Sequence, residues 1–231
     1  MSDRFAGART AGAWDDDYGR GRYVAAPPLP FAGDILAKAV ETGVADGLGL
    51  YIGCGNGRNY VPMVDAGLDL IGLDISAVAL EQLAIRRPGR AHRLVHGDLS
   101  ALPPGETYAM VIGIQVFQHG NRADAHRHVR AALERVDPGG LFCLRVNAVG
   151  TDVLYHHHVC ERSPDGGLTV RYRAGPKNGL DIHFFDREEI AALIPPGFDT
   201  LLPMRRDRTW RTRPATGQWS QWEGIWRRTL V

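Results

Sequence analysis

The chain has 231 residues, of which 44% are hydrophobic and 23% charged, as in an ordinary globular α/β domain. Its formal net charge of +1 gives no reason to expect nucleic acid or an anionic membrane as a partner. The three cysteines, Cys54, Cys143 and Cys160, lack the CxxC spacing of a zinc site, and no apolar run reaches the roughly 18 residues that span a bilayer. Because the N-terminus shows no signal-peptide pattern, we expect a cytoplasmic protein.

The N-terminal 30 residues are predicted to form a separate segment or cap, and residues 31–231 a single domain. The first dozen residues are small and polar, so we expect ordered structure to begin near Trp14. A proline-rich run at 27–30 then stops any helix. Apolar residues at helical spacing predict the next helix over 31–44.

Strands and helices alternate regularly from residue 48 onward. Nearly continuous apolar runs, such as 109–114, are typical of strands that are buried on both faces of a parallel sheet. The predicted elements are strand 48–53, helix 57–66, strand 69–74, helix 76–86, strand 92–96, strand 108–114, helix 121–136 and strand 140–147. This order predicts an α/β fold, a doubly wound, Rossmann-like and mostly parallel seven-stranded sheet.

Residues 148–183 interrupt this alternation and are predicted to be a small, lid-like insertion after the fifth strand. Residues 168–172 alternate like a strand between two turn signals, so the insertion is expected to contain a hairpin. It also holds His156, His157 and His158. Side chains in adjacent positions point in different directions, so this run does not predict a metal site.

The C-terminal part is predicted to complete the sheet. Asp186 and Glu189 have the spacing of a capping box and begin a helix over 187–194. Two final strands follow at 198–204 and 221–230. The connection between them has hairpin character, so the last strand is expected to be antiparallel.

The most informative motif is the glycine sequence after the first predicted strand. Gly53, Gly55 and Gly57 allow the backbone to approach a ligand closely. Asp74 ends the next predicted strand, where an acid accepts hydrogen bonds from a ribose. A nicotinamide-binding turn reads G-x-G-x-x-G, whereas here only Asn56 separates the last two glycines. This spacing favours a nucleotide-like ligand without a pyrophosphate.

In this order the motifs resemble those of the class I S-adenosylmethionine-dependent methyltransferases, from about residue 48 to the C-terminus. The resemblance implies S-adenosylmethionine as the cofactor, with its methionine part over the three glycines and its ribose hydroxyls on Asp74. Asp98 and Leu99 match the pair that flanks the adenine. The sequence departs from the family at Tyr51, where an acid is usual, and at Ala109. The full set of predicted cofactor residues is Tyr18, Tyr23, Gly53, Gly55, Gly57, Asp74, Ile75, Asp98, Leu99 and Gln115.

Gln115 and His119 are the predicted catalytic residues, because they match the family where its fourth strand opens into the active site. A sulfonium methyl group is already activated, so the enzyme mainly holds the nucleophile in line with it. A neutral amine or hydroxyl acceptor needs a base, for which His119 or one of the histidines at 156–158 is a candidate. A thiolate needs none. The alternative for His119 is a packing role at the strand exit.

The acceptor is predicted to be a small molecule. Trp14, Tyr18, Gly21 and Pro27 are similar to the N-terminal segment of thiol, halide and tellurite methyltransferases, which implies that Tyr18 and Tyr23 close over the cofactor. The predicted acceptor residues are Trp14, Arg145, Asn147, Tyr155, Arg171, Tyr172 and His183. The alternative for these residues is a solvated lid surface.

Two other functions remain open. Tryptophans and arginines interleave between residues 205 and 226, as in a platform for nucleic acid, although no Asn-Pro-Pro-Tyr-like motif follows the fourth strand. The second is a nicotinamide-dependent oxidoreductase, which the glycine spacing disfavours. The methylated atom and the oligomeric state stay open.

Overall fold

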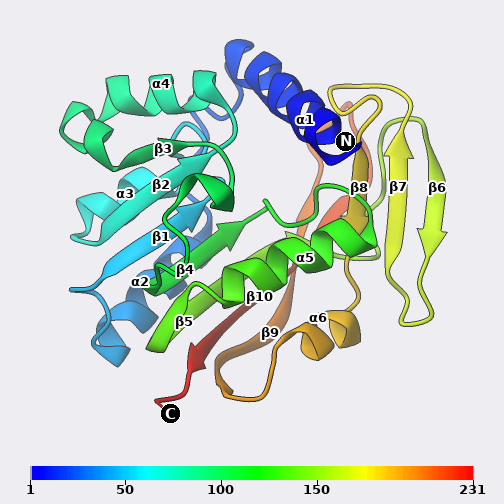
Figure 1. Ribbon diagram of the computed structural model, residues 1–231. Helices are drawn as coiled ribbons and strands as arrows, with labels where there is room; N and C mark the ends of the chain where they lie inside the picture. The colour runs from blue at the N-terminus through cyan, green and yellow to red at the C-terminus, as the bar shows by residue number, and fades with distance from the viewer. Residues whose placement is uncertain (1, 231) are drawn as a thin grey trace. The chain divides into compact units, whose positions relative to one another are not determined.

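The computed structural model describes residues 2–230, with side chains from residue 9 onward (Figure 1). The chain forms two compact units, one of residues up to 112 with 135–141, the other of 113–134 with the residues from 142 on. The strands of the main sheet are hydrogen-bonded in the order β3-β2-β1-β4-β5-β10-β9. This order confirms the predicted doubly wound, mostly parallel α/β fold. No helix within the described residues is long and apolar enough to cross a membrane.

The first unit begins the sheet and carries four α-helices. Its elements are α1 (Ser2–Gly19), α2 (Pro30–Thr42), β1 (Leu48–Ile52), α3 (Tyr60–Asp65), β2 (Asp69–Asp74), α4 (Ala77–Arg86), the 3-10 helices η1 (Pro88–Arg93) and η2 (Leu99–Ala101), β3 (Leu94–His96) and the start of β4 (Tyr108–Ile114). β1 pairs with β2 and β2 with β3, both in parallel (Figure 1). Leu50, Leu70 and Met110 are fully buried, as strands covered on both faces require.

Helix α1 corrects the expectation of a loose N-terminus, because it starts at Ser2 and not near Trp14. Its sequence has no apolar stripe, so hydrophobic periodicity gives no sign of a helix there. Contacts with α4 hold it instead. The Asp15 carboxylate accepts hydrogen bonds from Ser76 Oγ at 2.6 Å and from the Val78 amide at 3.2 Å. An acid at a helix N-terminus is favourable because it meets unpaired amides and the positive end of the helix dipole.

The second unit carries the end of the sheet and the insertion. Its elements are α5 (Arg122–Leu133), the second half of β5 (Val136–Asn147), β6 (His157–Arg162), β7 (Leu168–Tyr172), β8 (Asp181–Phe184), α6 (Arg187–Leu193), β9 (Phe198–Trp210) and β10 (Gln218–Arg228). β10 pairs antiparallel with β9, which confirms the expected antiparallel last strand. The insertion is a three-stranded antiparallel sheet, β6-β7-β8, around Val170, Tyr172, Ile182 and Phe184 (Figure 1). The hairpin expected from the sequence is therefore present, and a third strand that was not predicted extends it.

Both helices of the second unit begin with a capping box. Asn121 and Asp124 exchange side-chain hydrogen bonds with each other's backbone amides at the start of α5. Asp186 and Glu189 do the same at the start of α6, as the spacing predicted. The reciprocal bonds satisfy amides that a helix leaves unpaired, which explains why α6 begins at Arg187.

Candidate cofactor and acceptor sites

The glycine turn lies between β1 and α3 and needs glycine at each of its three positions. Gly53, Gly55 and Gly57 have φ values of +70°, +55° and +92°, in the left-handed region that favours glycine. A Cβ at Gly55 would also collide with the Tyr18 hydroxyl. The Gly53 amide donates to the Leu73 carbonyl at 2.7 Å, which fixes the turn beside the end of β2.

Asp74 lies at the end of β2, beside this turn, and is 7% exposed. Its Oδ2 accepts a hydrogen bond from the Gly55 amide at 2.7 Å, and its Oδ1 accepts one from the Ser76 amide at 2.8 Å. Burial raises the pKa of Asp74, although both hydrogen bonds act in the opposite direction. Each carboxylate oxygen has about two lone pairs. The carboxylate is therefore held in place by the backbone and still able to accept bonds from a pair of hydroxyls.

An aromatic group from the N-terminal segment, formed by Trp14, Tyr18 and Tyr23, covers the glycine turn. The Tyr18 ring centroid lies 5.8 Å from that of Trp14 and 6.5 Å from that of Tyr23. The Arg22 guanidinium stacks on Tyr23 at 4.7 Å. Burial, together with the nearby Asp74 carboxylate, raises the pKa of Tyr18, so its hydroxyl stays protonated. We call this group the aromatic cover.

Two side chains of the first unit fix the aromatic cover to the turn. Asn56, inside the glycine turn, donates from Nδ2 to the Arg22 carbonyl at 2.9 Å. Gln82, on α4, donates from Nε2 to the Tyr18 carbonyl at 3.0 Å. Asn56 therefore belongs to this site, although the sequence pattern indicates only that it separates the last two glycines. The only sign of this role in the sequence is that Asn56 lies between two glycines of the turn, Gly55 and Gly57.

The ends of three neighbouring strands carry the remaining cofactor residues of the first unit. Asp98 follows β3 and caps η2, accepting from the Ser100 amide at 2.8 Å. Leu99 and Ile75 are half-buried, and the Ile75 carbonyl lies 3.1 Å from His96 Nε2. Parallel pairing brings the ends of β1, β2 and β3 to one edge. Ligands of open α/β sheets bind at this edge, beyond the carboxyl ends of the strands.

Tyr51 stands where the resemblance leads us to expect an acid. It is 2% exposed, and its ring meets that of Tyr60 edge-on at 6.2 Å. Tyr60 in turn donates its hydroxyl to the Leu70 carbonyl at 2.9 Å. Tyr51 therefore packs into the core between β1 and α3, which is a packing role that the family pattern does not predict.

In the second unit, Gln115 and His119 lie on the loop after β4. Gln115 has φ +58°, a left-handed conformation that is uncommon for a residue other than glycine. Its amide donates to the Arg145 carbonyl at 2.7 Å, and its carbonyl accepts from Gln118 Nε2 at 2.6 Å. His119 is half-buried and forms a β-bridge with Ile182. Backbone strain held in this way is typical of functional loops.

Arg145 and Asn147, two predicted acceptor residues, are buried in β5. Arg145 Nε donates to Glu223 at 2.7 Å, and its Nη2 donates to Asp207 at 2.6 Å and to Gln221 at 3.1 Å. The Asn147 carbonyl accepts from the Phe185 amide at 2.8 Å. The guanidinium of Arg145 is thus engaged by carboxylates of β9 and β10.

The other predicted acceptor residues of the second unit do not form one group. Arg171 makes two hydrogen bonds of 2.6 Å with the Asp181 carboxylate on the surface. Tyr172 is buried in the core of the insertion sheet, and Tyr155 is exposed. His183 is buried and has partners at both ring nitrogens, Thr169 and Glu189.

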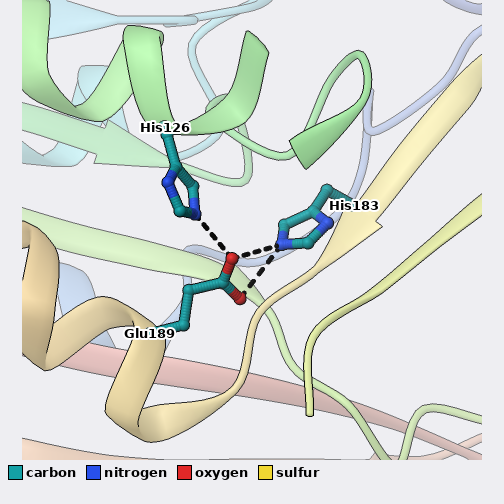
Figure 2. A group of neighbouring side chains, drawn as sticks. All are labelled: His126, His183 and Glu189. Atoms are coloured by element: carbon teal, nitrogen blue, oxygen red, sulfur yellow. Dashed lines mark hydrogen bonds and ion pairs between the residues drawn. The ribbon is translucent and has the colours of Figure 1, made fainter. Parts of the chain in front are cut away.

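His183 belongs to a buried cluster with His126 and Glu189, one that the sequence motifs did not reveal (Figure 2). His126 Nε2 lies 2.5 Å from Glu189 Oε1, and His183 Nε2 lies 3.0 Å from the same oxygen. Burial alone would raise the pKa of Glu189, but hydrogen bonds from both histidines hold that pKa well below its ordinary value. Sequence reasoning assigned Glu189 only to the helix cap, and the histidines are too far apart in sequence to form a motif.

Comparisons with known proteins place the fold. Residues 50–140 match a family model described as a methyltransferase domain. A search of the curated proteins gives no match. Among solved structures, the chain is similar to the 1,6-didemethyltoxoflavin-N1-methyltransferase of Burkholderia thailandensis, with a TM-score of 0.62 and 16% identity over 96% of this chain and 90% of that chain.

Two further solved structures have the same fold. TehB from Haemophilus influenzae has a TM-score of 0.61 and 17% identity, covering 93% of this chain and 67% of that chain. An S-adenosylmethionine-dependent methyltransferase from Clostridium acetobutylicum has a TM-score of 0.57 and 15% identity, covering 86% and 91%. The matched model shows a methyltransferase domain over residues 50–140, and the solved structures show that the fold is that of S-adenosylmethionine-dependent methyltransferases.

Proposed function

We propose that this enzyme transfers the methyl group of S-adenosylmethionine to a small-molecule acceptor in the cytoplasm. The observation that carries the cofactor part is the glycine turn joined to Asp74 by the 2.7 Å bond from the Gly55 amide. The turn leaves no room for a Cβ at Gly55, and Asp74 keeps lone pairs for hydroxyl donors. Both features fit a ligand that combines an extended amino-acid arm with a ribose.

The residues of the first unit divide the binding task. Gly53, Gly55 and Gly57 present backbone to the amino-acid arm, and the Asp74 carboxylate accepts hydrogen bonds from the ribose hydroxyls. The aromatic cover excludes water from this region, which strengthens polar interactions within it. When bound, S-adenosylmethionine supplies an activated methyl group. The reaction then depends mainly on how the protein orients the acceptor.

The small-molecule part of the proposal rests on three solved structures with this fold. Their names describe methylation of 1,6-didemethyltoxoflavin, of a glycopeptide and of an amino pentose. The insertion sheet after β5 is a segment that can contribute to an acceptor site. On the acceptor side we assign Gln115 to positioning and His119 to proton removal when the acceptor is neutral.

Calorimetry tests the cofactor assignment directly. S-adenosylhomocysteine is expected to bind the full chain with one site, and reduced nicotinamide dinucleotide is expected not to bind. Asp74→Asn serves as the matched variant, because it keeps the shape of the side chain and removes its charge. Binding of the nicotinamide nucleotide in place of S-adenosylhomocysteine would favour the oxidoreductase alternative.

A second measurement addresses the acceptor class. Fluorescence anisotropy with a single-stranded RNA is expected to show no binding at physiological salt, because the net charge is only +1. Tight binding that weakens steeply with salt would contradict a small-molecule acceptor and favour the nucleic-acid alternative. Arg206 and Arg211, which stack on Trp222 and Trp219 at 4.5 Å, are the residues to replace in that case.

A further inference from the structure

We propose that His126, His183 and Glu189 bind one transition-metal ion of the zinc type within the second unit. The three residues come from α5, β8 and α6 and point toward one another (Figure 2). Their side chains are buried, and their candidate ligand atoms all lie within 4.8 Å of one another. Two imidazole nitrogens and one carboxylate oxygen are a ligand set that zinc proteins use.

The hydrogen bonding of Glu189 supports a cation at this position. Its Oε1 lies 2.5 Å from His126 Nε2, 3.0 Å from His183 Nε2 and 2.8 Å from Arg122 Nε. A carboxylate oxygen has about two lone pairs, so three N–H groups at Oε1 exceed them by one, and the His183 N–H is shared with Oε2, which lies 3.1 Å from it. One cation in place of the two imidazole protons removes this excess, because both rings then become ligands and Arg122 keeps its hydrogen bond.

The surroundings already orient the ligands. His183 Nδ1 lies 2.9 Å from Thr169 Oγ1, and Glu189 Oε2 accepts from the Asp186 amide at 3.2 Å. A metal-bound histidine normally donates its other ring N–H to an oxygen, which Thr169 provides here. Coordination of neutral His183 through Nε2 moves its proton to Nδ1 and releases none. The shift requires only that the Thr169 hydroxyl turn to accept.

A surface cavity gives the ion a route to the cluster. It has a volume of about 660 Å³, and its lining includes Arg122, His126 and Thr169. Solvent in this cavity can reach His126, whose side chain is 11% exposed. Three protein ligands with water in the remaining position make up the usual tetrahedral arrangement of zinc. Oxygen-preferring Mg²⁺ and Ca²⁺ suit two imidazoles poorly.

Such an ion would join the insertion sheet to the helices of the second unit. His183 lies on β8 of that sheet, whereas His126 and Glu189 lie on α5 and α6. Binding to the folded state alone stabilises it by mass action, so the melting temperature is expected to rise with the concentration of the metal.

The test uses the full chain prepared without a polyhistidine tag and treated with a chelator. Titration with Zn²⁺ is expected to show one equivalent bound, and Co²⁺ to give visible absorption of a site with nitrogen and oxygen ligands. His126→Gln is expected to weaken Zn²⁺ binding more than the roughly 10–100-fold that an outer residue costs. His156→Gln, which replaces an exposed histidine of the insertion, is the matched control and is expected to leave the Zn²⁺ affinity unchanged.

Thr169→Val is the second variant, because it removes the partner of His183 Nδ1 without removing a ligand. It is expected to weaken Zn²⁺ binding by roughly tenfold or more and to keep the circular dichroism spectrum of the wild type. Absence of stoichiometric binding to the wild type would overturn the proposal. Binding that persists in His126→Gln and disappears in His156→Gln would also overturn it. None of these measurements depends on methyl transfer.

Discussion

Asp74 in the first unit and Glu189 in the second are both buried carboxylates beside a turn or a helix end, and their pKa values shift in opposite directions. Asp74 in the first unit receives two backbone N–H groups, and burial raises its pKa. Glu189 in the second unit is surrounded by two imidazoles, a guanidinium and a backbone amide, and its pKa falls well below the ordinary value.

The difference shows whether each carboxylate can still accept hydrogen bonds from a ligand. Asp74 is positioned without being saturated, so donors from a ligand can complete its hydrogen bonding. Glu189 already has four donors for the roughly four lone pairs of its carboxylate, so it serves to hold protein segments, or a cation, together. A buried acid at a strand end is therefore informative only once its donors are counted.

Glu189→Gln tests the second half of this comparison and is expected to have the largest effect. The amide loses the negative charge and turns N–H groups toward the N–H groups of His126 and His183. Breaking a buried ionic group in this way costs about 3–5 kcal/mol. Urea unfolding in the presence of a chelator measures it. Glu188→Gln is the control, because it changes the preceding residue, which is largely exposed. Its free energy of unfolding is expected to stay within about 0.5 kcal/mol of the wild-type value.

Asp74→Asn tests the first half of the comparison. Loss of charge-assisted bonds to the ribose is expected to weaken S-adenosylhomocysteine binding by about 1.5–3 kcal/mol, or roughly ten- to a hundredfold. Calorimetry measures the dissociation constant. Asp69→Asn, at the start of the same strand and paired with Arg90 and Arg93, is the control and should leave the affinity unchanged. Equal losses in both variants would mean that the ribose is held elsewhere.

The two carboxylates are also expected to respond to pH with opposite signs. Glu189, with its lowered pKa, contributes stability that is lost as pH falls below the ordinary glutamate value of about 4.3. The stability gap between the wild type and Glu189→Gln should therefore narrow by up to about 1.4 kcal/mol per pH unit.

Asp74, with its raised pKa, binds its proton more tightly in the folded state, so stability falls as pH rises above about 3.9 toward the folded pKa. Wild type should lose stability relative to Asp74→Asn over that interval. Urea unfolding of wild type and both variants across the acidic range checks the two signs. If the differences in unfolding free energy between the wild type and the two variants change in the same direction with pH, the comparison is contradicted.

Gly55→Ala is expected to have a smaller effect, again in the first unit. A left-handed φ of +55° costs a residue with a Cβ about 1–2 kcal/mol, and Tyr18 must also move. Thermal unfolding and S-adenosylhomocysteine titration both measure the change. Gly33→Ala is a control of opposite sign, because its added methyl group meets nothing within 4 Å inside α2 and is expected to stabilise the helix by about 0.5–1 kcal/mol.

Most of the fold was predictable because its signals are local. Apolar runs and glycine turns mark the strands from 48 to 147, and the Asp186–Glu189 spacing marks the start of α6. Helix α1 was not predictable, because it lacks an apolar stripe and depends on Asp15 meeting α4. The third strand of the insertion was missed because turn signals surround a segment of only four residues, β8.

The sites were predictable to different degrees for the same reason. Gly53, Gly55 and Asp74 form a motif because two adjacent strands bring them together, and the structure joins them by a hydrogen bond. The Arg145 side chain meets carboxylates from strands that lie more than 60 residues further along the chain. The cluster of His126 and His183 likewise depends on tertiary packing of the insertion, for which no spacing rule exists. The roles assigned to Gln115 and His119 stay predictions.

Asp15→Ala is expected to give the smallest effect, about 1 kcal/mol, because Ser76 Oγ and the Val78 amide lose one acceptor at the start of α4. This variant also tests whether the aromatic cover belongs to the cofactor site beside Asp74. Trypsin cleavage after Arg20 and Arg22 is expected to be faster than in the wild type, and S-adenosylhomocysteine to slow it again. Asp16→Ala changes the exposed neighbour and should cleave like the wild type. If the ligand protects neither protein, the cover is packing on the first unit and Asp74 binds the ribose without it.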